Sequence, residues 1–480
     1  MLFNSVEYLL VFLPFVVLVS FASSRPQRVF LTAASFLFYG YWSVRFIPFL
    51  AISILLNFVC GRWLAAHPAS PSTLRRAVLI VGLLFNVGLL GFFKYADFFI
   101  ANLNAVAGWE LGLLQLALPL GISFITFQKV AFLVDCFRGQ VKRIDLLDFS
   151  LFVTFFPQLI AGPIVHHAEV IPQFGATSTL KTRYEEIATA TFLVSVGLFK
   201  KVVLADSFAV YANIGHAQAA SLTFVGAWET SFLYSFQLYF DFSGYTDMAL
   251  GSALALGIRL PPNFLSPYKA TSIQEFWRRW HVTLGRFLRE YVYVPLGGGR
   301  ATLARTLANL MITFLIGGIW HGAGWLFVVW GALHGLAMGV HRVWTSAGLR
   351  MPRAAGWVAT FLFVDVAWVP FRANSPESAL AILSTMAGAN GVVLPVVLQN
   401  HLAWAGDVVS FGSWGFPASG SHGVIALIAA GAAIVFLLPN SMEWAARSPT
   451  SLFRLVTSFV FFATAYVMLG RPSAFLYWQF

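Results

Sequence analysis

The sequence has 480 residues, of which 59% are hydrophobic and only 10% are charged, and its formal net charge is +11. This composition excludes an ordinary soluble domain, in which about 25% of the residues are charged. Uninterrupted apolar runs also exclude a transmembrane β-barrel, whose strands alternate over about 10 residues, and the positive charge is typical of basic cytoplasmic loops.

Apolar segments follow one another along the whole chain, and we expect most of them to be membrane helices. They lie near residues 6–22, 29–44, 46–60, 77–93, 113–134, 149–165, 187–211, 222–240, 245–258, 306–320, 323–341, 355–371, 379–398, 423–438 and 452–470. Some are too short to cross a bilayer alone, so re-entrant or interfacial helices are expected as well. The sequence predicts an all-α polytopic membrane protein with about 11–12 transmembrane helices. A single integral-membrane domain is expected over residues 1–480.

The first unusual stretch is residues 155–174, where Pro157 and Pro163 interrupt an apolar helix. Broken backbone at membrane depth is tolerated only inside protein or beside a water-filled cavity. His166 and His167 are adjacent, and on a helix their side chains would diverge by about 100°, which makes a poor metal-binding pair. The sequence contains no HExxH, CxxC or Walker glycine loop, so no metal site is expected.

A second polar stretch covers residues 235–251, SFQLYFDFSGYTDMALG, with a polar side chain at every odd position from 235 to 247. Period two is typical of a strand, but a lone strand cannot satisfy its backbone inside a bilayer. We therefore expect a helix that is buried in protein or lines a wet cavity, broken or kinked at Gly244. Its side chains either position a substrate or form a structural hydrogen-bonded cluster, and the sequence leaves both interpretations open. The candidates are Asp241, Ser243, Tyr245 and Asp247.

The longest polar interval is residues 259–305, which carry eight basic and two acidic residues and hence a net charge of +6. Residues 274–300 within it are predicted to form one amphipathic helix at the membrane interface, with its aromatic side chains toward the membrane. A cytoplasmic loop explains much of this charge. The alternative is a docking surface for a phosphorylated substrate, because guanidinium groups match phosphate oxygens. His281 lies in this element, where an isolated histidine is more often structural.

One titratable group, His321, stands in the middle of the apolar stretch of residues 312–343. An ionisable side chain at that depth is expensive to solvate and is functional by default. The alternative is a core histidine that is hydrogen-bonded to a neighbouring helix. Trp320 and Trp325 supply bulky walls beside it. Small residues at spacings that allow close helix approach are Gly318, Gly322, Gly331, Gly335 and Gly339.

Seven blocks of this sequence together resemble the membrane-bound O-acyltransferase (MBOAT) family, and more closely its bacterial alginate O-acetylase branch. The blocks are MLFNSVEYLLVFLP, PLGISFITFQKVAFLVDCFRG, FFPQLIAGPIV, YFDFSGYTDMALG, NFLSPYKATSIQEFWRRWHVTLGRFLREYVYVPLGGGR, GGIWHGAGWLFVVWGALHG and FLYWQF. The resemblance implies a bundle of tilted helices around a tunnel that joins the two membrane faces. It also implies that His321 is the catalytic histidine and that His281 is the second active-site position.

The implied reaction moves an acetyl group from acetyl-CoA, the donor substrate, to an acceptor on the outer side of a bacterial inner membrane, with no bound cofactor. Arg278, Arg279 and Arg286 are expected to hold the CoA phosphates. The expected acceptor is an exopolysaccharide, alginate first, with cellulose, peptidoglycan or another polymer as alternatives. The implied residues along the tunnel are Asp241, Ser243, Tyr245, Asp247, Trp320 and Trp325.

The expected partners are a periplasmic acetyltransferase or esterase-like protein and membrane lipid, and no nucleic acid is expected. Other interpretations stay open at this point. One is a polytopic transporter or channel for an anionic metabolite, because such proteins also carry intramembrane polar groups and broken helices. The others are D-alanyl transfer and lipid acyl transfer within the same family.

Overall fold

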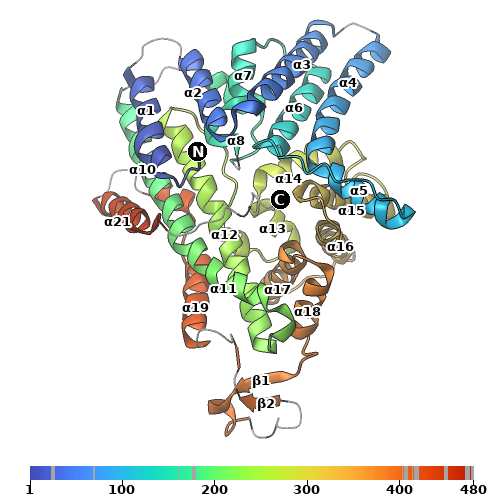
Figure 1. Ribbon diagram of the computed structural model, residues 1–480, viewed down its shortest axis with the longest axis vertical. Coiled ribbons are helices and arrows are strands. Elements are labelled where there is room, and N and C mark those ends of the chain that lie inside the picture. Colours follow the sequence, from blue (N-terminus) through green and yellow to red (C-terminus); the bar gives the residue numbers. More distant parts are fainter. Residues whose placement is uncertain are drawn as a thin grey trace. The chain divides into compact units, whose positions relative to one another are not determined.

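Helices form nearly all of the secondary structure in the computed structural model of this chain (Figure 1). The structure describes residues 1–22, 27–68, 71–160, 162–175, 180–402, 404, 409–412, 414–415, 421–447, 452–470 and 476. Apart from residue 476, the closing FLYWQF block lies outside the described residues. The all-α membrane class that the sequence predicts is confirmed.

The chain divides into two compact units. Unit 1 comprises residues 1–198, 245–263 and 445–463, and unit 2 comprises residues 199–244, 264–444 and 464–480. Among the described residues, α12 (Phe224–Ala255), α20 (Ser441–Arg447) and α21 (Leu452–Met468) belong to both units, and the last residue of α10, Phe199, also belongs to unit 2. The single domain expected over residues 1–480 stays a prediction.

Unit 1 contains the helices of the N-terminal half of the chain. They are η1 (Glu7–Phe12), α1 (Leu13–Ala22), α2 (Gln27–Trp42), η2 (Val44–Phe46), α3 (Ile47–Ala66), α4 (Ser72–Leu90), η3 (Gly91–Tyr95), α5 (Ala96–Ala107), α6 (Ile122–Phe137), α7 (Leu146–Thr154), α8 (Phe156–Leu159), α9 (His167–Val170), η4 (Ile171–Gln173) and α10 (Leu180–Phe199). Helix α6 packs against α3 and α4, and α7 packs against α2 and α3.

Unit 2 contains most of the remaining elements. They are η5 (Lys200–Ala205), α11 (Asp206–Ala217), η6 (Ala219–Ser221), η7 (Pro267–Lys269), α13 (Ile273–Arg279), α14 (Val282–Leu288), η8 (Arg289–Tyr293), α15 (Leu303–His321), α16 (Trp325–Ser346), α17 (Arg353–Arg372), α18 (Pro376–Met386), β1 (Val392–Pro395), η9 (Val396–Leu398), β2 (Val409–Gly412) and α19 (Ser421–Leu437). The strands β1 and β2 pair in parallel, with Val392 opposite Val409.

Six helical stretches among the described residues are long and apolar enough to cross a membrane. They are Val44–Ala66, Ser72–Ala107, Tyr184–Ala217, Leu303–His321, Trp325–Ser346 and Arg353–Arg372. A seventh span is added if Gly423–Leu437 and Ser441–Arg447, which are bent by 53°, count together. The larger number expected from the sequence includes apolar segments that form shorter helices, such as α6 with 16 residues and α7 with nine.

Helices α15 and α16 approach each other closely because glycines face glycines at their crossing. The Cα atom of Gly331 on α16 is among the atoms nearest to Gly318 on α15, and a side chain at either position would meet the partner backbone. This confirms the close approach that the glycine spacing predicts. It also places the end of α15, where His321 lies, against α16.

Two polar stretches fold differently from the sequence-based expectation. Residues 274–300 do not form one helix, because α13 ends at Arg279 and α14 begins at Val282 after a break at Trp280 and His281. Helix α12 continues through Gly244 without interruption, so the expected break there is wrong. All the polar side chains at its odd positions are buried, as the sequence predicts.

The third polar stretch, residues 155–174, is broken as predicted. Helix α7 ends at Thr154, Phe155 is non-helical with φ −47° and ψ 105°, and α8 is only four residues long. Phe155, Phe156 and Gln158 are buried, so the broken backbone is surrounded by protein.

Candidate active site

His321 is the last residue of α15, and its side chain is buried. The imidazole meets three aromatic rings edge-on, with centroid distances of 5.0 Å to Trp320, 5.0 Å to Trp330 and 5.2 Å to Phe371. These rings come from α15, α16 and α17. Three helices therefore fix the orientation of this imidazole in an aromatic environment.

His281 occupies the break between α13 and α14 and has a left-handed backbone with φ 44° and ψ 52°. A residue other than glycine in this region costs about 1–3 kcal/mol, and such strain is concentrated at functional sites. The side chain is completely buried, and its ring meets Phe242 of α12 edge-on at 4.8 Å. Burial lowers the pKa of His281, which lies outside the six spans, to about 3. The imidazole is therefore neutral near pH 7.

The structure brings the two predicted histidines together around one indole. The Trp320 ring lies 5.0 Å from the His321 ring and 6.1 Å from the His281 ring, measured between centroids. His281 and His321 are 40 residues apart in the sequence, and both belong to unit 2. Of the two tryptophans predicted to line the tunnel, Trp320 belongs to this group, whereas Trp325 is 61% exposed.

A third histidine extends the same aromatic group, and the sequence analysis missed it. His334 of α16 is completely buried, and its ring lies 4.7 Å from that of Trp330. Its Nδ1 accepts a hydrogen bond from the indole N–H of Trp277 at 3.2 Å. The signal was available in the sequence, because Trp330 and His334 are four residues apart and so lie on one helix face.

Asp241 of α12 takes part in a buried ion-pair group. Lys201 Nζ lies 2.6 Å from Asp241 Oδ1 and 2.9 Å from Asp206 Oδ1, and the backbone N–H of Leu476 donates to Asp241 Oδ2 at 3.2 Å. Lys201 and Asp241 are each about 1% exposed. For Asp241 these contacts favour the structural interpretation over direct placement of a substrate. Lys201 was also missed, although a lysine inside an apolar segment is itself a signal.

The other candidates on α12 lie on either side of the division between the units. Ser243 belongs to unit 2 and is buried, and its hydroxyl has no hydrogen-bond partner among the described residues. Tyr245 and Asp247 are also buried but belong to unit 1. There the Tyr245 ring stacks on that of Phe3, with 4.6 Å between centroids.

The three predicted CoA-binding arginines have different surroundings. Arg279 Nη2 forms an ion pair with Glu275 at 2.7 Å, and its Nη1 donates to the carbonyl of Leu265 at 3.2 Å. Arg286 is half-buried on α14. Arg278 is exposed and close enough to His341 of α16 to interact with it electrostatically. Of the three, Arg278 is the most exposed.

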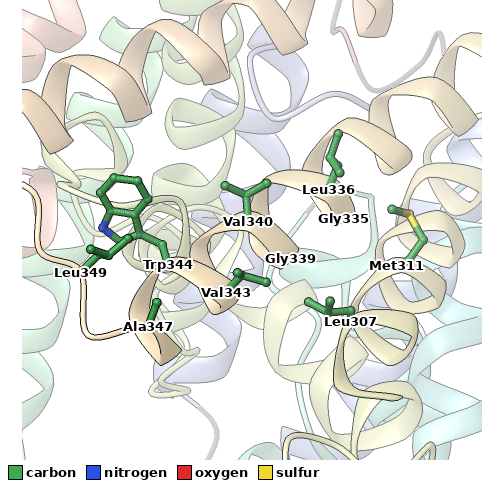
Figure 2. Close-up of a pocket in the computed structure, with 10 residues that line it drawn as sticks. All are labelled: Leu307, Met311, Gly335, Leu336, Gly339, Val340, Val343, Trp344, Ala347 and Leu349. Carbon is green, nitrogen blue, oxygen red and sulfur yellow. The ribbon is translucent and has the colours of Figure 1, made fainter. Parts of the chain in front are cut away.

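Two pockets lie along α16 in unit 2. The larger has a volume of about 720 Å³ and polar side chains at its wall, including His341, Thr345 and Arg350. The smaller has a volume of about 410 Å³, and Figure 2 shows its apolar wall, with Leu307 and Met311 from α15 facing residues of α16. Neither pocket is lined by His321 or His281, so the tunnel implied by the resemblance stays a prediction.

The described residues contain the features of a membrane-embedded transferase, namely several apolar spans and two buried imidazoles around one indole. The model of the membrane-bound O-acyltransferase family matches residues 137–378. The chain belongs to this family and is a multi-pass membrane O-acyltransferase. Membership of this enzyme family argues against the alternative interpretation, which was a transporter or channel that catalyses no reaction.

Curated relatives match most of the chain. It is 46% identical over 429 residues to a peptidoglycan O-acetyltransferase of Helicobacter pylori, a match that covers 82% of this chain and 81% of that protein. It is 38% identical over 394 residues to a probable alginate O-acetylase AlgI of Azotobacter vinelandii, covering 80% and 78%. A teichoic acid D-alanyltransferase of Streptococcus thermophilus is 28% identical over 47% of this chain and 57% of its own length.

Proposed function

We propose that this chain transfers acetyl groups from acetyl-CoA to hydroxyl groups of an extracytoplasmic polysaccharide, as a protein of the bacterial inner membrane. The observation that carries the proposal is the placement of His281 and His321 around the same indole in a chain of this family. Relatives that are 46% and 38% identical bear names that specify O-acetylation.

In the proposed reaction the acceptor hydroxyl oxygen attacks the thioester carbonyl carbon, the new C–O bond forms, and the C–S bond breaks. His321 accepts the hydroxyl proton and returns it to the departing sulfur, so that CoA leaves as a thiol. Imidazole suits both steps, because its reference pKa of about 6.5 lies near working pH. His281, which is neutral because burial lowers its pKa to about 3, would lie beside the thioester and help to orient it.

The donor would approach from the basic segment that contains α13 and α14. Exposed Arg278 lies near His341, and His341 and Arg350 line the larger pocket. Guanidinium groups bind phosphate oxygens well, so this surface suits the phosphates of acetyl-CoA. Arg279 would shape the surface rather than bind the donor, because Glu275 and the Leu265 carbonyl already hold its guanidinium. Acetyl-CoA is a substrate here, and the proposal needs no bound cofactor.

For the acceptor, the relatives favour a cell-envelope polysaccharide, and two polymers compete. Alginate is the acceptor expected from the sequence, and the 38% identical relatives support it. The 46% identity with a peptidoglycan O-acetyltransferase supports peptidoglycan as the second candidate. In either case we propose that a periplasmic acetyltransferase or esterase-like partner completes the transfer to the polymer. D-alanyl transfer has weaker support, because those relatives are 28% and 27% identical over less than half of this chain.

The proposal is tested with the purified full-length chain in lipid nanodiscs and acetyl-CoA that is radiolabelled in the acetyl group. We expect release of CoA thiol and transfer of label to peptidoglycan or alginate oligosaccharides, directly or after a periplasmic partner is added. His321→Ala should lower this release by at least about 100-fold, and His67→Ala, at an exposed histidine of unit 1, should leave it unchanged. Release with long-chain acyl-CoA but not with acetyl-CoA would replace the proposal with lipid acyl transfer.

A further inference from the structure

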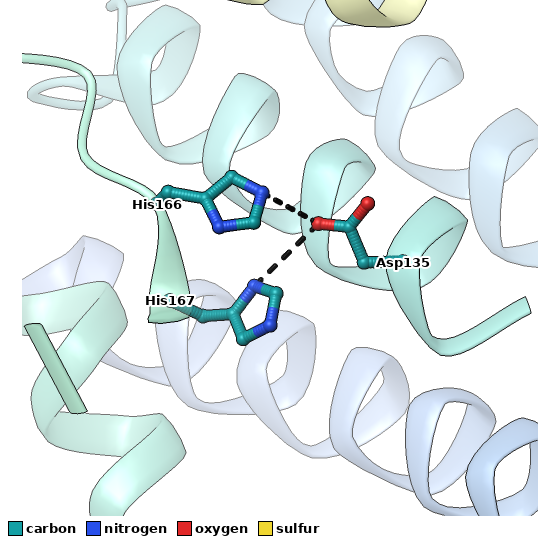
Figure 3. A group of neighbouring side chains, drawn as sticks. All are labelled: Asp135, His166 and His167. Carbon is teal, nitrogen blue, oxygen red and sulfur yellow. Dashed lines mark ion pairs between the residues drawn. The ribbon is translucent and has the colours of Figure 1, made fainter. Parts of the chain in front are cut away.

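The broken stretch of residues 155–174 brings three metal-binding side chains together in unit 1 (Figure 3). His166 Nε2 lies 2.7 Å from Asp135 Oδ2, and His167 Nδ1 lies 3.6 Å from the same oxygen. One ligand atom from each residue lies within 4.8 Å of the other two. Figure 3 shows both imidazole rings turned toward one carboxylate of α6.

The sequence-based argument against this histidine pair rested on a helix, and that premise is wrong. His166 has extended backbone, with φ −94° and ψ 140°, and stands just before α9, which begins at His167. The change of backbone direction between the two residues lets adjacent side chains converge, with ring centroids 4.5 Å apart. Glu169 holds this turn, because its carboxylate accepts the backbone N–H of His166 at 3.2 Å.

Hydrogen bonds do not account for the whole cluster. His167 is 8% exposed, and its Nδ1 has no hydrogen-bond partner among the described residues, although it points at Asp135 Oδ2. A buried nitrogen in this position normally has a partner. Neutral imidazole with an available lone pair is the form that binds a metal ion.

The separations between the ligand atoms suit a small divalent ion, provided that the shortest one increases. Ligands about 2.0–2.1 Å from a tetrahedral zinc ion lie about 3.3–3.4 Å from one another. The 3.6 Å separation of His167 Nδ1 from Asp135 Oδ2 is close to this value. The 2.7 Å separation at His166 fits a hydrogen bond with the proton between nitrogen and oxygen. Metal binding uses the Nε2 lone pair, so this proton moves to Nδ1 or is released to solvent, and the two atoms then separate.

The charges around the cluster have both signs. Arg138 Nη1 lies 3.8 Å from Asp135 Oδ1, which opposes a cation, but the arginine side chain is 35% exposed and can turn to solvent. Glu169 brings a second carboxylate next to the cluster through the backbone of His166. Two imidazoles and one carboxylate form the ligand set preferred by zinc and related first-row ions over magnesium or calcium.

We propose that Asp135, His166 and His167 bind one divalent transition-metal ion of the zinc class. The ion joins α6 to the start of α9 and so fixes the backbone within the broken stretch. The role is structural and does not depend on the acyl-transfer proposal, because the acyl-transfer residues His281 and His321 belong to unit 2.

The test measures metal directly on the full-length chain in nanodiscs. The protein is stripped with a chelator, incubated with Zn²⁺ or Co²⁺ and desalted, and its metal content is determined by mass spectrometry. We expect one ion per chain and a visible absorption band with Co²⁺. His167→Gln should weaken Zn²⁺ binding by at least about tenfold. The matched control is His216→Gln, because His216 is also buried without a hydrogen-bond partner among the described residues but lies in unit 2.

Asp135→Asn keeps an oxygen that can accept the His166 N–H, so it preserves the hydrogen bond while it weakens the metal site. We expect Zn²⁺ to raise the unfolding temperature of the wild type but not that of Asp135→Asn. A wild type that binds no Zn²⁺ or Co²⁺ would overturn the proposal, and so would a His167→Gln variant with unchanged affinity. If His167→Gln does not fold, Asp135→Asn and the wild-type cobalt spectrum decide the question.

Discussion

The protein contains two pairs of histidines, and their surroundings differ. In unit 2, aromatic rings surround His321 and His281, and the Trp320 ring contacts both. In unit 1, His166 and His167 converge on the carboxylate of Asp135. An aromatic surrounding orients an imidazole, which suits proton transfer. A carboxylate adds negative charge and a third ligand, which suits a cation. The same residue type is therefore suited to different chemistry in the two units.

The largest expected effect is on the rate of acetyl transfer, through the histidine pair of unit 2, His281 and His321. His321→Ala should lower acetyl transfer by about 10²–10⁴-fold, which is the usual contribution of a general acid or base. The loss should appear in kcat, because the variant still binds the donor. Transfer from radiolabelled acetyl-CoA measures it, with His67→Ala as the control. If His321→Ala kept the wild-type rate, this pair would be structural and the contrast between the two pairs would disappear.

A large effect on stability is expected from the ion-pair group of Lys201, Asp206 and Asp241 in unit 2. Lys201→Met leaves buried Asp241 and half-buried Asp206 without their cation, and loss of one partner of a buried ion pair costs about 3–5 kcal/mol. Unfolding of the variant in detergent should therefore begin at a clearly lower temperature. Lys200→Met is the control, because Lys200 is only half-buried and its bond to Ser441 is long at 3.4 Å. Equal unfolding temperatures for the two variants would show that the ion-pair group contributes little.

A smaller effect follows from the neutral state of His281. Burial lowers the pKa of His281 from 6.5 to about 3, so the unfolded chain binds this proton at a higher pH than the folded chain does. The resulting contribution to stability is complete above pH 6.5 and is lost as the pH falls from 6.5 toward 3. His281→Gln removes the titration, so its stability should fall less steeply than that of the wild type over this range. Unfolding temperatures at several pH values test this, and parallel curves would mean that His281 is accessible to protons in the folded state.

Sequence patterns predicted the features that depend on local composition. Apolar runs indicated the helices, prolines indicated the break in residues 155–174, and glycine spacing indicated the contact between α15 and α16. The placement of His321 among aromatic rings agrees with the pattern of tryptophans around it. These features could be predicted because each depends on residues that are close together in the chain.

Features that depend on distant residues were not predicted. The break at His281 has a left-handed residue without glycine or proline, and burial of Phe276 and Trp280, which precede it, holds it in place. The ion partner of Asp241 is Lys201, 40 residues earlier in the sequence. Asp135 and His166 are 31 residues apart, and no spacing rule connects them. In each case tertiary packing decided the outcome.

The smallest expected effect is on the KM for acetyl-CoA, through the basic surface that is proposed to bind this donor near His281 and His321. Arg278→Glu reverses an exposed charge near the larger pocket, so it should raise the KM for acetyl-CoA by about tenfold at low salt and less at high salt, where exposed charges are screened. Arg289→Glu makes the same change at an exposed arginine of the same basic segment and should have a weaker effect. Because Arg278 does not contact the reacting atoms, kcat should stay near the wild-type value. A loss of kcat with unchanged KM would instead place Arg278 in the chemistry, and equal shifts for both variants would reduce the surface to a general electrostatic attraction.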